Sequence, residues 1–289
     1  MTEPMQTHEL KAEALLRAKQ QQMSWASENR ILMERPDYTL KAEGNLFAPL
    51  SEHCIKELGG AQGGELKRRS NGAPPKFHAL HSSAALVANV FDYWRNRDLS
   101  ILAEALNSPH ALVSMKGEVP FSTGFGFPAN LDVVLTSEDQ NWLLAIESKF
   151  LEPFGNHDPS LKIGYVPVDG DSAWKKMGLT KCDLLARDLQ SNPARFEYLN
   201  CPQNLKHILA LSKGVSNRFR LLYLFYGVEG PVGDAHRAEA EDFKNAVAGE
   251  VDFEWMTYQS LVRRLRELSG DSANDGYFEY LKARYQLWS

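Results

Sequence analysis

Hydrophobic positions in the segment 141–150 (NWLLAIESKF) fill both faces of an extended strand until Glu147 and Lys149 are reached. Side chains alternate along a strand with a period of two, so these two charged residues share one face. A strand that is apolar on both faces is typical of the centre of a covered sheet. Burying a charge there is costly unless the charge is paired or holds a metal ion, so Glu147 and Lys149 indicate a candidate functional site.

Hydrophobic periodicity elsewhere predicts the alternation of strands and helices that is typical of an α/β domain. Strand-like runs occupy 111–121, 130–136, 218–228 and 251–258. Helical patterns occupy 82–107, 178–213 with breaks near Pro193 and Pro202, 235–247 and 259–268. Ser82 or Ser83 is suited to cap the first of these helices. We therefore expect a central mixed β-sheet flanked by helices.

The N-terminal part of the chain has a different pattern. In residues 8–35 the apolar positions are spaced among charged ones, and this pattern predicts a helix that ends before Pro36. Glycines, prolines and basic residues in 59–75 favour a loop. We expect a helical N-terminal extension over 1–58, a flexible linker or loop over 59–76 and the α/β domain over 77–289. Residues 151–177, rich in Pro, Gly and Asp, predict an irregular insertion.

Asp132 interrupts the aliphatic run 130–136 (NLDVVLT), and a short polar turn then leads into the strand that carries Glu147. A hairpin turn centred between Asp139 and Gln140 places Asp132 directly opposite Glu147. Opposed residues project on one face with Cβ atoms about 5 Å apart. Two carboxylates that close repel unless a cation or a proton lies between them.

Oxygen ligands of this kind, few in number and partly open to solvent, suit Mg²⁺ or Mn²⁺. The chemistry that we expect is phosphodiester hydrolysis, with Asp132, Glu147 and the carbonyl of Ser148 holding the metal. The metal lowers the pKa of a bound water and neutralises phosphate charge. Lys149 is placed to orient the water or stabilise the transition state. The structural alternative is a buried salt bridge from Lys149 to Asp132 or Glu147.

Composition narrows the class of protein further. The chain has 289 residues, of which 43% are hydrophobic, and a net charge of -5, which argues against a strongly basic, non-specific DNA-binding protein. Three widely spaced cysteines predict neither a disulfide framework nor a zinc site. The N-terminus lacks the apolar region of a secretory signal, and no apolar run is long enough to span a membrane. We expect a cytoplasmic location.

Asp132 followed by Glu147-Ser148-Lys149 resembles the D…(D/E)XK motif of the PD-(D/E)XK nuclease superfamily, which has the restriction-endonuclease-like fold. The longer pattern from ESKFLEP through QNLKHILAL to YLFYG looks like an uncharacterised bacterial group of such proteins. The segment GEVPF is similar to the first core strand of recombination-repair exonucleases in this superfamily, with Glu118 in the place of their glutamate. The resemblance covers about residues 77–228.

The resemblance implies further site residues and a metal. The helix start CPQNLKHILAL resembles the glutamine motif of these nucleases, which adds Gln203 to the catalytic set. Glu118 joins the implied ligands of Mg²⁺ or Mn²⁺. The chain departs from the pattern in two places: Leu131 replaces the proline before the aspartate, and His207 stands where the exonucleases have a tyrosine. The second departure puts exonuclease action in doubt.

These observations favour a metal-dependent nuclease whose substrate is nucleic acid, DNA in the first instance. The interpretation leaves room for a homodimer and implies no membrane partner. The first competing hypothesis is a non-catalytic DNA-binding or assembly module on the same fold, against which the intact Asp, Glu and Lys set argues. The second is a glycosidase that uses a carboxylate pair. Chelation separates them, because it abolishes metal-dependent phosphodiester cleavage and leaves glycoside chemistry unchanged.

Overall fold

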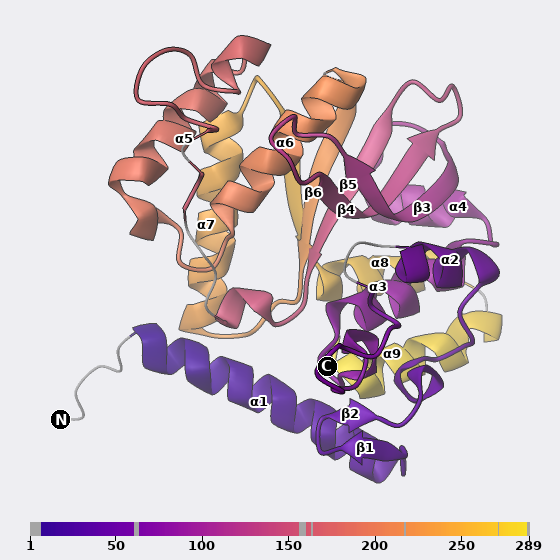
Figure 1. Ribbon diagram of the computed structural model, residues 1–289. Helices are drawn as coiled ribbons and strands as arrows, with labels where there is room; N and C mark the ends of the chain where they lie inside the picture. The colour runs from indigo at the N-terminus through magenta and orange to yellow at the C-terminus, as the bar shows by residue number, and fades with distance from the viewer. Residues whose placement is uncertain are drawn as a thin grey trace.

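A computed structural model describes residues 7–60, 64–155, 160–162, 164–216, 218–270 and 272–287 (Figure 1). Its main sheet has the strand order β3-β4-β5-β6-β7. The strands are β3 (Leu112–Phe121), β4 (Ala129–Ser137), β5 (Leu143–Lys149), β6 (Phe219–Phe225) and β7 (Asp252–Thr257). The first three strands pair antiparallel and the last three parallel, so the sheet is mixed. This confirms the expected sheet.

Helices lie on both faces of this sheet. The longer ones are α1 (Thr7–Glu28), α5 (Thr180–Ser191), α6 (Cys201–Val215), α7 (Pro231–Val247), α8 (Tyr258–Ser269) and α9 (Asp275–Tyr285). The shorter ones are α2 (Glu52–Gly60), α3 (Ser83–Phe91) and α4 (Leu99–Ala105). Ser82 caps α3 by accepting a hydrogen bond from the backbone N–H of Ala85.

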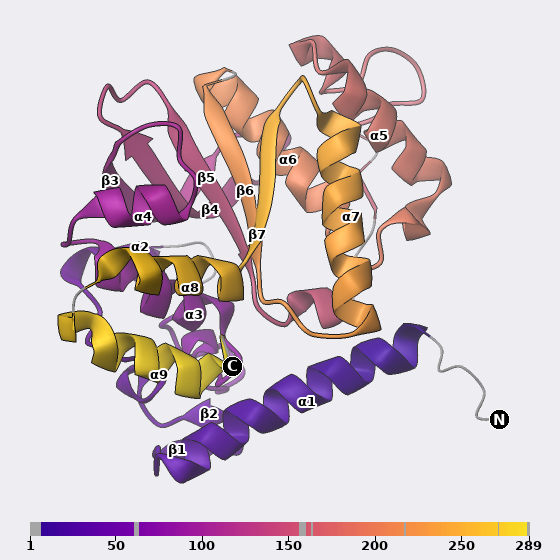
Figure 2. The ribbon, with the colours of Figure 1, turned by 180° about the vertical axis from the view of Figure 1, so that it is seen from behind.

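Two hydrophobic clusters fill the space between sheet and helices. On one face, α3, α4, α8 and α9 pack against side chains such as Val133 and Ile146. On the other face, α5, α6 and α7 pack against side chains such as Val134 and Ala145. The two views of the ribbon show this arrangement of helices on either side of the strands (Figures 1 and 2). None of the described helices combines the length and apolar character that crossing a bilayer needs.

The strand β5 lies at the centre of the sheet, between β4 and β6, as its apolar faces predicted. The ladder with β4 pairs Val133 with Ile146 and Leu135 with Leu144. This is the register expected from a turn centred between Asp139 and Gln140. Gln140 has a φ of 56°, a left-handed conformation that closes the turn without Asn-Gly or Asp-Gly. The ladder therefore brings Asp132 and Glu147 to the same end of the hairpin.

The N-terminal region differs from expectation. The first helix ends at Glu28 and does not continue to residue 35, because 33–35 form a short strand, β1 (Met33–Arg35), paired with β2 (Tyr38–Thr39). Arg30, with a φ of 54°, turns the chain out of the helix. The helix α9 was not predicted. Residues 61–63 of the expected linker lie outside the described residues.

Candidate active site

The hairpin of β4 and β5 joins Asp132 to the segment that carries Glu147 and Lys149. The Oδ2 atom of Asp132 accepts a hydrogen bond of 2.6 Å from the backbone N–H of Ser148. This contact lies just beyond the last ladder pair, Val133 with Ile146. The two strands thus hold the aspartate against the Glu-Ser-Lys triplet, the juxtaposition that the sequence predicted.

Glu147 is buried, with 2% of its surface exposed, and has two cationic or polar neighbours. Its Oε1 atom forms an ion pair with the ammonium of Lys149, two residues along the same strand face. Its Oε2 atom lies 2.9 Å from Nε2 of His207 on α6. That approach is short but is not aligned as a hydrogen bond, so Oε2 has no hydrogen-bond partner among the described residues.

The pKa values of the carboxyl groups of Asp132 and Glu147 are shifted in opposite directions. Burial raises the pKa of Asp132 well above its ordinary 3.8, and the negative charge of Glu147 raises it further. Burial alone would also raise the pKa of Glu147, but Lys149 and His207 outweigh it and lower that pKa from 4.5 to about 2. Glu147 is therefore the ionised member of the pair, and Asp132 resists ionisation beside it.

Lys149 is held as a cation by its surroundings. Burial would lower the pKa of its ammonium, but the carboxylates of Glu147 and Asp132 outweigh burial and raise it. The side chain is only 13% exposed, so its charge acts in a poorly hydrated environment. The sequence left a buried salt bridge from Lys149 to Asp132 or Glu147 as the structural alternative, and the ion pair with Glu147 is present. The same ammonium is also a fixed positive charge at the end of β5.

Glu118 lies on β3, the neighbour of β4, at an irregular point of the strand. Its φ is 51°, and the ladder between β3 and β4 pairs Gly117 with Val133 and Val119 with Leu131 on either side. Burial raises the pKa of Glu118 to about 7, with further contributions from Glu65 and Glu147. The coupling to Glu147 places this third carboxyl group in the field of the other two.

Ser148 is fixed from both sides. Its backbone N–H donates to Asp132, and its hydroxyl lies 2.6 Å from the hydroxyl of Tyr258, a fully buried residue at the start of α8. The hydroxyl pair ties the end of β5 to the start of α8. The backbone of Ser148, whose carbonyl was expected to bind metal, is thereby held in one position.

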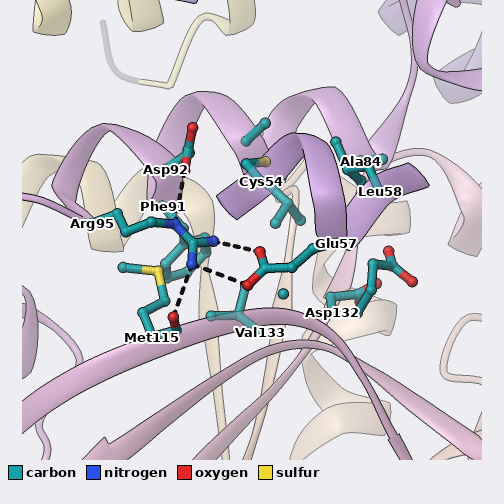
Figure 3. Close-up of a pocket in the computed structure, with 14 residues that line it drawn as sticks. Cys54, Glu57, Leu58, Ala84, Phe91, Asp92, Arg95, Met115, Asp132 and Val133 are labelled. Atoms are coloured by element: carbon teal, nitrogen blue, oxygen red, sulfur yellow. Dashed lines mark hydrogen bonds and ion pairs between the residues drawn. The ribbon is translucent and has the colours of Figure 1, made fainter. Parts of the chain in front are cut away.

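A pocket reaches Asp132 from the side of α2 and α3 (Figure 3). Arg95 lies at one end of this pocket, where it forms ion pairs with Glu57 on α2 and with Asp92. Asp132 lies at the other end (Figure 3). A Cβ atom at Gly117 would come within 2.9 Å of Oε2 of Glu57, so a larger residue there would displace the Glu57 carboxylate from its position at Arg95.

The donor set of the site fits a divalent cation, although the described residues contain no group of three His, Cys, Asp or Glu side chains already arranged around a metal position. Two observations support the fit. The Oε2 atom of Glu147 is buried without an aligned hydrogen bond, and burial, together with the negative charge of Glu147, raises the pKa of the Asp132 carboxyl group. A cation between these groups would satisfy both.

The structure brings together five of the expected residues, which are Asp132, Glu147, Ser148, Lys149 and, through its charge, Glu118. The sixth, Gln203, is in the first turn of α6, where its backbone N–H is capped by Asn200. No contact found among the described residues joins its side chain to the others.

The sequence did not identify His207 or Tyr258 as parts of this region. His207 follows Gln203 by one helical turn, so the two share a face of α6, and this spacing was the available signal. Tyr258 is separated from Ser148 by the strands β6 and β7 and the helices α5, α6 and α7, and no local pattern relates them.

One comparison with known proteins found a match. The model of a family described as restriction endonuclease associating with ARP matches residues 19–286. No curated protein and no solved structure matches the chain.

Proposed function

The chain belongs to the family described as restriction endonuclease associating with ARP, and from that premise we propose that it is a metal-dependent nuclease of the PD-(D/E)XK type. The mixed sheet flanked by helices is consistent with a restriction-endonuclease-like fold. The proposed reaction is hydrolysis of phosphodiester bonds in nucleic acid, with DNA as the first substrate to test, and Mg²⁺ or Mn²⁺ as the cofactor.

The observation that carries this proposal is the state of Glu147. The Glu147 carboxylate is 2% exposed, and the ion pair between its Oε1 atom and Lys149 keeps it ionised. Its Oε2 atom lies 2.9 Å from Nε2 of His207 but makes no aligned hydrogen bond among the described residues. A buried acceptor without a hydrogen bond forgoes stability, so Oε2 at the end of β5 is suited to a cation from outside the chain.

The residues take distinct roles in the proposed reaction. Asp132 and Glu147 would hold the metal together with the carbonyl of Ser148, and Glu118 would extend this set. When bound, the metal supplies a water of lowered pKa and neutralises charge on the phosphate. The hydrogen bond from Ser148 fixes Oδ2 of Asp132. The remaining oxygen of Asp132 is therefore the one left for the metal.

Lys149 supplies positive charge where the reacting phosphate gains negative charge. Its ammonium is held as a cation by Glu147 and Asp132, and it cannot ligate a metal while protonated. Stabilisation of this kind contributes strongly in a site with little water, typically a factor of about 10²–10³ for one donor. His207 limits the positions open to the Glu147 carboxylate, because it lies against Oε2.

A cleavage assay tests the proposal. Linear, circular and single-stranded DNA, and matching RNA, are incubated with the full chain and Mg²⁺, with and without a chelator. We expect cleavage of at least one substrate, its loss on chelation and its recovery with added Mg²⁺ or Mn²⁺. Glu147→Gln should abolish cleavage. Glu138→Gln, the same change at an exposed position in the turn of the same hairpin, should leave the rate unchanged.

The competing hypothesis of a non-catalytic module predicts a different result. Such a module would bind DNA without cutting any substrate, and Glu147→Gln would not alter the binding. Cleavage that persists in Glu147→Gln at the wild-type rate would place the reaction elsewhere or identify a contaminating nuclease.

A further inference from the structure

The loop between β3 and β4, residues 122–128 (STGFGFP), carries the side chain of Phe127 with 76% of its surface exposed. A second aromatic residue of the loop, Phe125, is 40% exposed. A single exposed apolar side chain is ordinary on a protein surface, so a role for Phe127 depends on how the loop is built and where it lies.

Internal contacts fix the conformation of this loop. The hydroxyl of Thr123 accepts a hydrogen bond from the backbone N–H of Phe125 (3.1 Å) and donates one to the carbonyl of Phe127 (3.2 Å). The ring of Phe125 packs on Tyr165 with 4.5 Å between centroids. Gly124 and Gly126 have φ values of 80° and 97°, which allow the reversal. Phe125 is thus anchored while Phe127 projects.

Two lysines lie against this loop, one beside the Phe127 ring and one at the start of the loop. The ammonium of Lys162 lies 5.8 Å from the centroid of the Phe127 ring, on a segment that is otherwise distant in sequence. The ammonium of Lys213, at the end of α6, donates a hydrogen bond of 3.1 Å to the carbonyl of Thr123. Both lysine side chains are exposed. A loop that presents an exposed aromatic ring together with cationic side chains matches nucleic acid, in which flat bases alternate with anionic phosphates.

The loop connects the two strands that carry Glu118 and Asp132, and it runs beside α6 (Figure 1). Phe127 precedes Asp132 by five residues, so the extended chain separates them by at most about 17 Å. That is about five base-pair rises of B-form DNA at 3.4 Å each. A strand of substrate held at the carboxylates therefore comes within reach of the loop.

We propose that Phe127 is a stacking platform for an unpaired nucleobase of the substrate, while Lys162 and Lys213 contact the adjoining phosphates. The inference rests on the proposed function, because it names the form of nucleic acid that the same site takes. An unpaired base exposes its flat face to a projecting ring, whereas a base within a duplex is already stacked on both sides. The preferred substrate therefore has a single-stranded segment beside the cleaved bond.

Binding in the absence of metal tests this inference without cleavage. Fluorescein-labelled single-stranded DNA and the matching blunt duplex are titrated with the full chain and followed by fluorescence anisotropy. Phe127→Ala should weaken single-strand binding about fivefold or more, which is about 1 kcal/mol, and leave duplex binding unchanged. Phe127→Trp should retain single-strand binding. Leu184→Ala, which truncates an apolar side chain that is 62% exposed on α5, is the matched control and should bind like the wild type.

Two further readouts separate stacking from a structural effect. DNA with 2-aminopurine in place of adenine should lose fluorescence on binding to the wild type and not to Phe127→Ala. Lys162→Ala should reduce the slope of log affinity against log salt by about 0.7, the value for one phosphate contact on a single strand. Circular dichroism of each variant should match the wild type, because the altered side chains are exposed.

Equal single-strand binding by the wild type and Phe127→Ala would overturn the inference and leave the proposed nuclease function intact. A wild type that binds no nucleic acid of any form would overturn both together. If Phe127→Ala binds DNA normally but abolishes a dimer seen by sedimentation, the loop is an interface between copies of this chain, and stacking is refuted.

Discussion

Replacing Lys149 with methionine should destabilise the metal-free protein, because it removes the cation that balances a buried carboxylate. Methionine keeps the unbranched apolar stem of lysine and loses only the ammonium. After this change Glu147, which is 2% exposed, keeps His207 as a neighbour but loses its ion pair with residue 149. The effect therefore measures what the charge contributes to the fold rather than what the packing contributes.

The magnitude follows from the burial of the pair. Lys149 is 13% and Glu147 2% exposed, so solvent screens their attraction little. Removing one partner of a buried ion pair typically costs about 3–5 kcal/mol. For a chain of this size each kcal/mol lowers Tm by about 2 °C, so we expect a fall of roughly 6–10 °C. Added Mg²⁺ should recover part of this loss if it binds beside Glu147 and supplies the missing positive charge.

The pH dependence has a definite sign. In the wild type the pKa of Glu147 is lowered from 4.5 to about 2, so its ionised form stabilises the fold above pH 4.5, and this contribution is lost as the pH falls to about 2. Without Lys149, burial dominates and raises the pKa of Glu147 above 4.5. The resulting penalty is present at neutral pH and is relieved on acidification. The difference in Tm should therefore narrow from about pH 7 to about pH 4.

Differential scanning calorimetry of both proteins across this pH range, with and without Mg²⁺, is the assay. The double variant Lys149→Met with Glu147→Gln should recover most of the lost stability, because it removes the unpaired charge as well. A Lys149→Met protein that melts with the wild type at neutral pH without metal would refute the reasoning. It would mean that the Glu147 carboxylate is balanced by groups other than Lys149.

Three further predictions concern neighbouring groups. Asp132→Asn should stabilise the metal-free fold at neutral pH by about 1 kcal/mol or more, because burial and the charge of Glu147 raise the pKa of Asp132 well above 3.8. The gain should vanish as the pH falls below about 3.8, where the carboxyl group is protonated in folded and unfolded chains alike. A variant with a lower Tm than the wild type at neutral pH would contradict the prediction. Tyr258→Phe should cost about 1–3 kcal/mol in thermal unfolding by leaving the buried Ser148 hydroxyl without its partner, and an unchanged Tm would show that the hydroxyl pair contributes nothing. Arg95→Met should speed hydrogen exchange in α2, which this side chain anchors, and leave α9 protected; equal exchange in α2 would remove that anchoring role.

The sequence by itself determined the centre of the fold and the core of the candidate site. Apolar residues on both faces of 142–146 predicted a strand covered on two sides, and β5 lies there. The short polar turn before it suggested the hairpin register without compelling it, since the turn lacks Asn-Gly or Asp-Gly. The structure has that register, and it brings Asp132 beside the segment of Glu147 and Lys149.

Tertiary structure alone decided the environment of that site. The contacts of Glu147 with His207 and of Ser148 with Tyr258 join segments that are 60 or more residues apart. They depend on how α6 and α8 pack on the sheet, which no local periodicity specifies. The opposite pKa shifts of Asp132 and Glu147 also arise there, because burial and the positions of neighbouring charges are properties of the packed chain. Alternation along a strand sets which side chains share a face, whereas only the assembled layers set how much water and charge surround them.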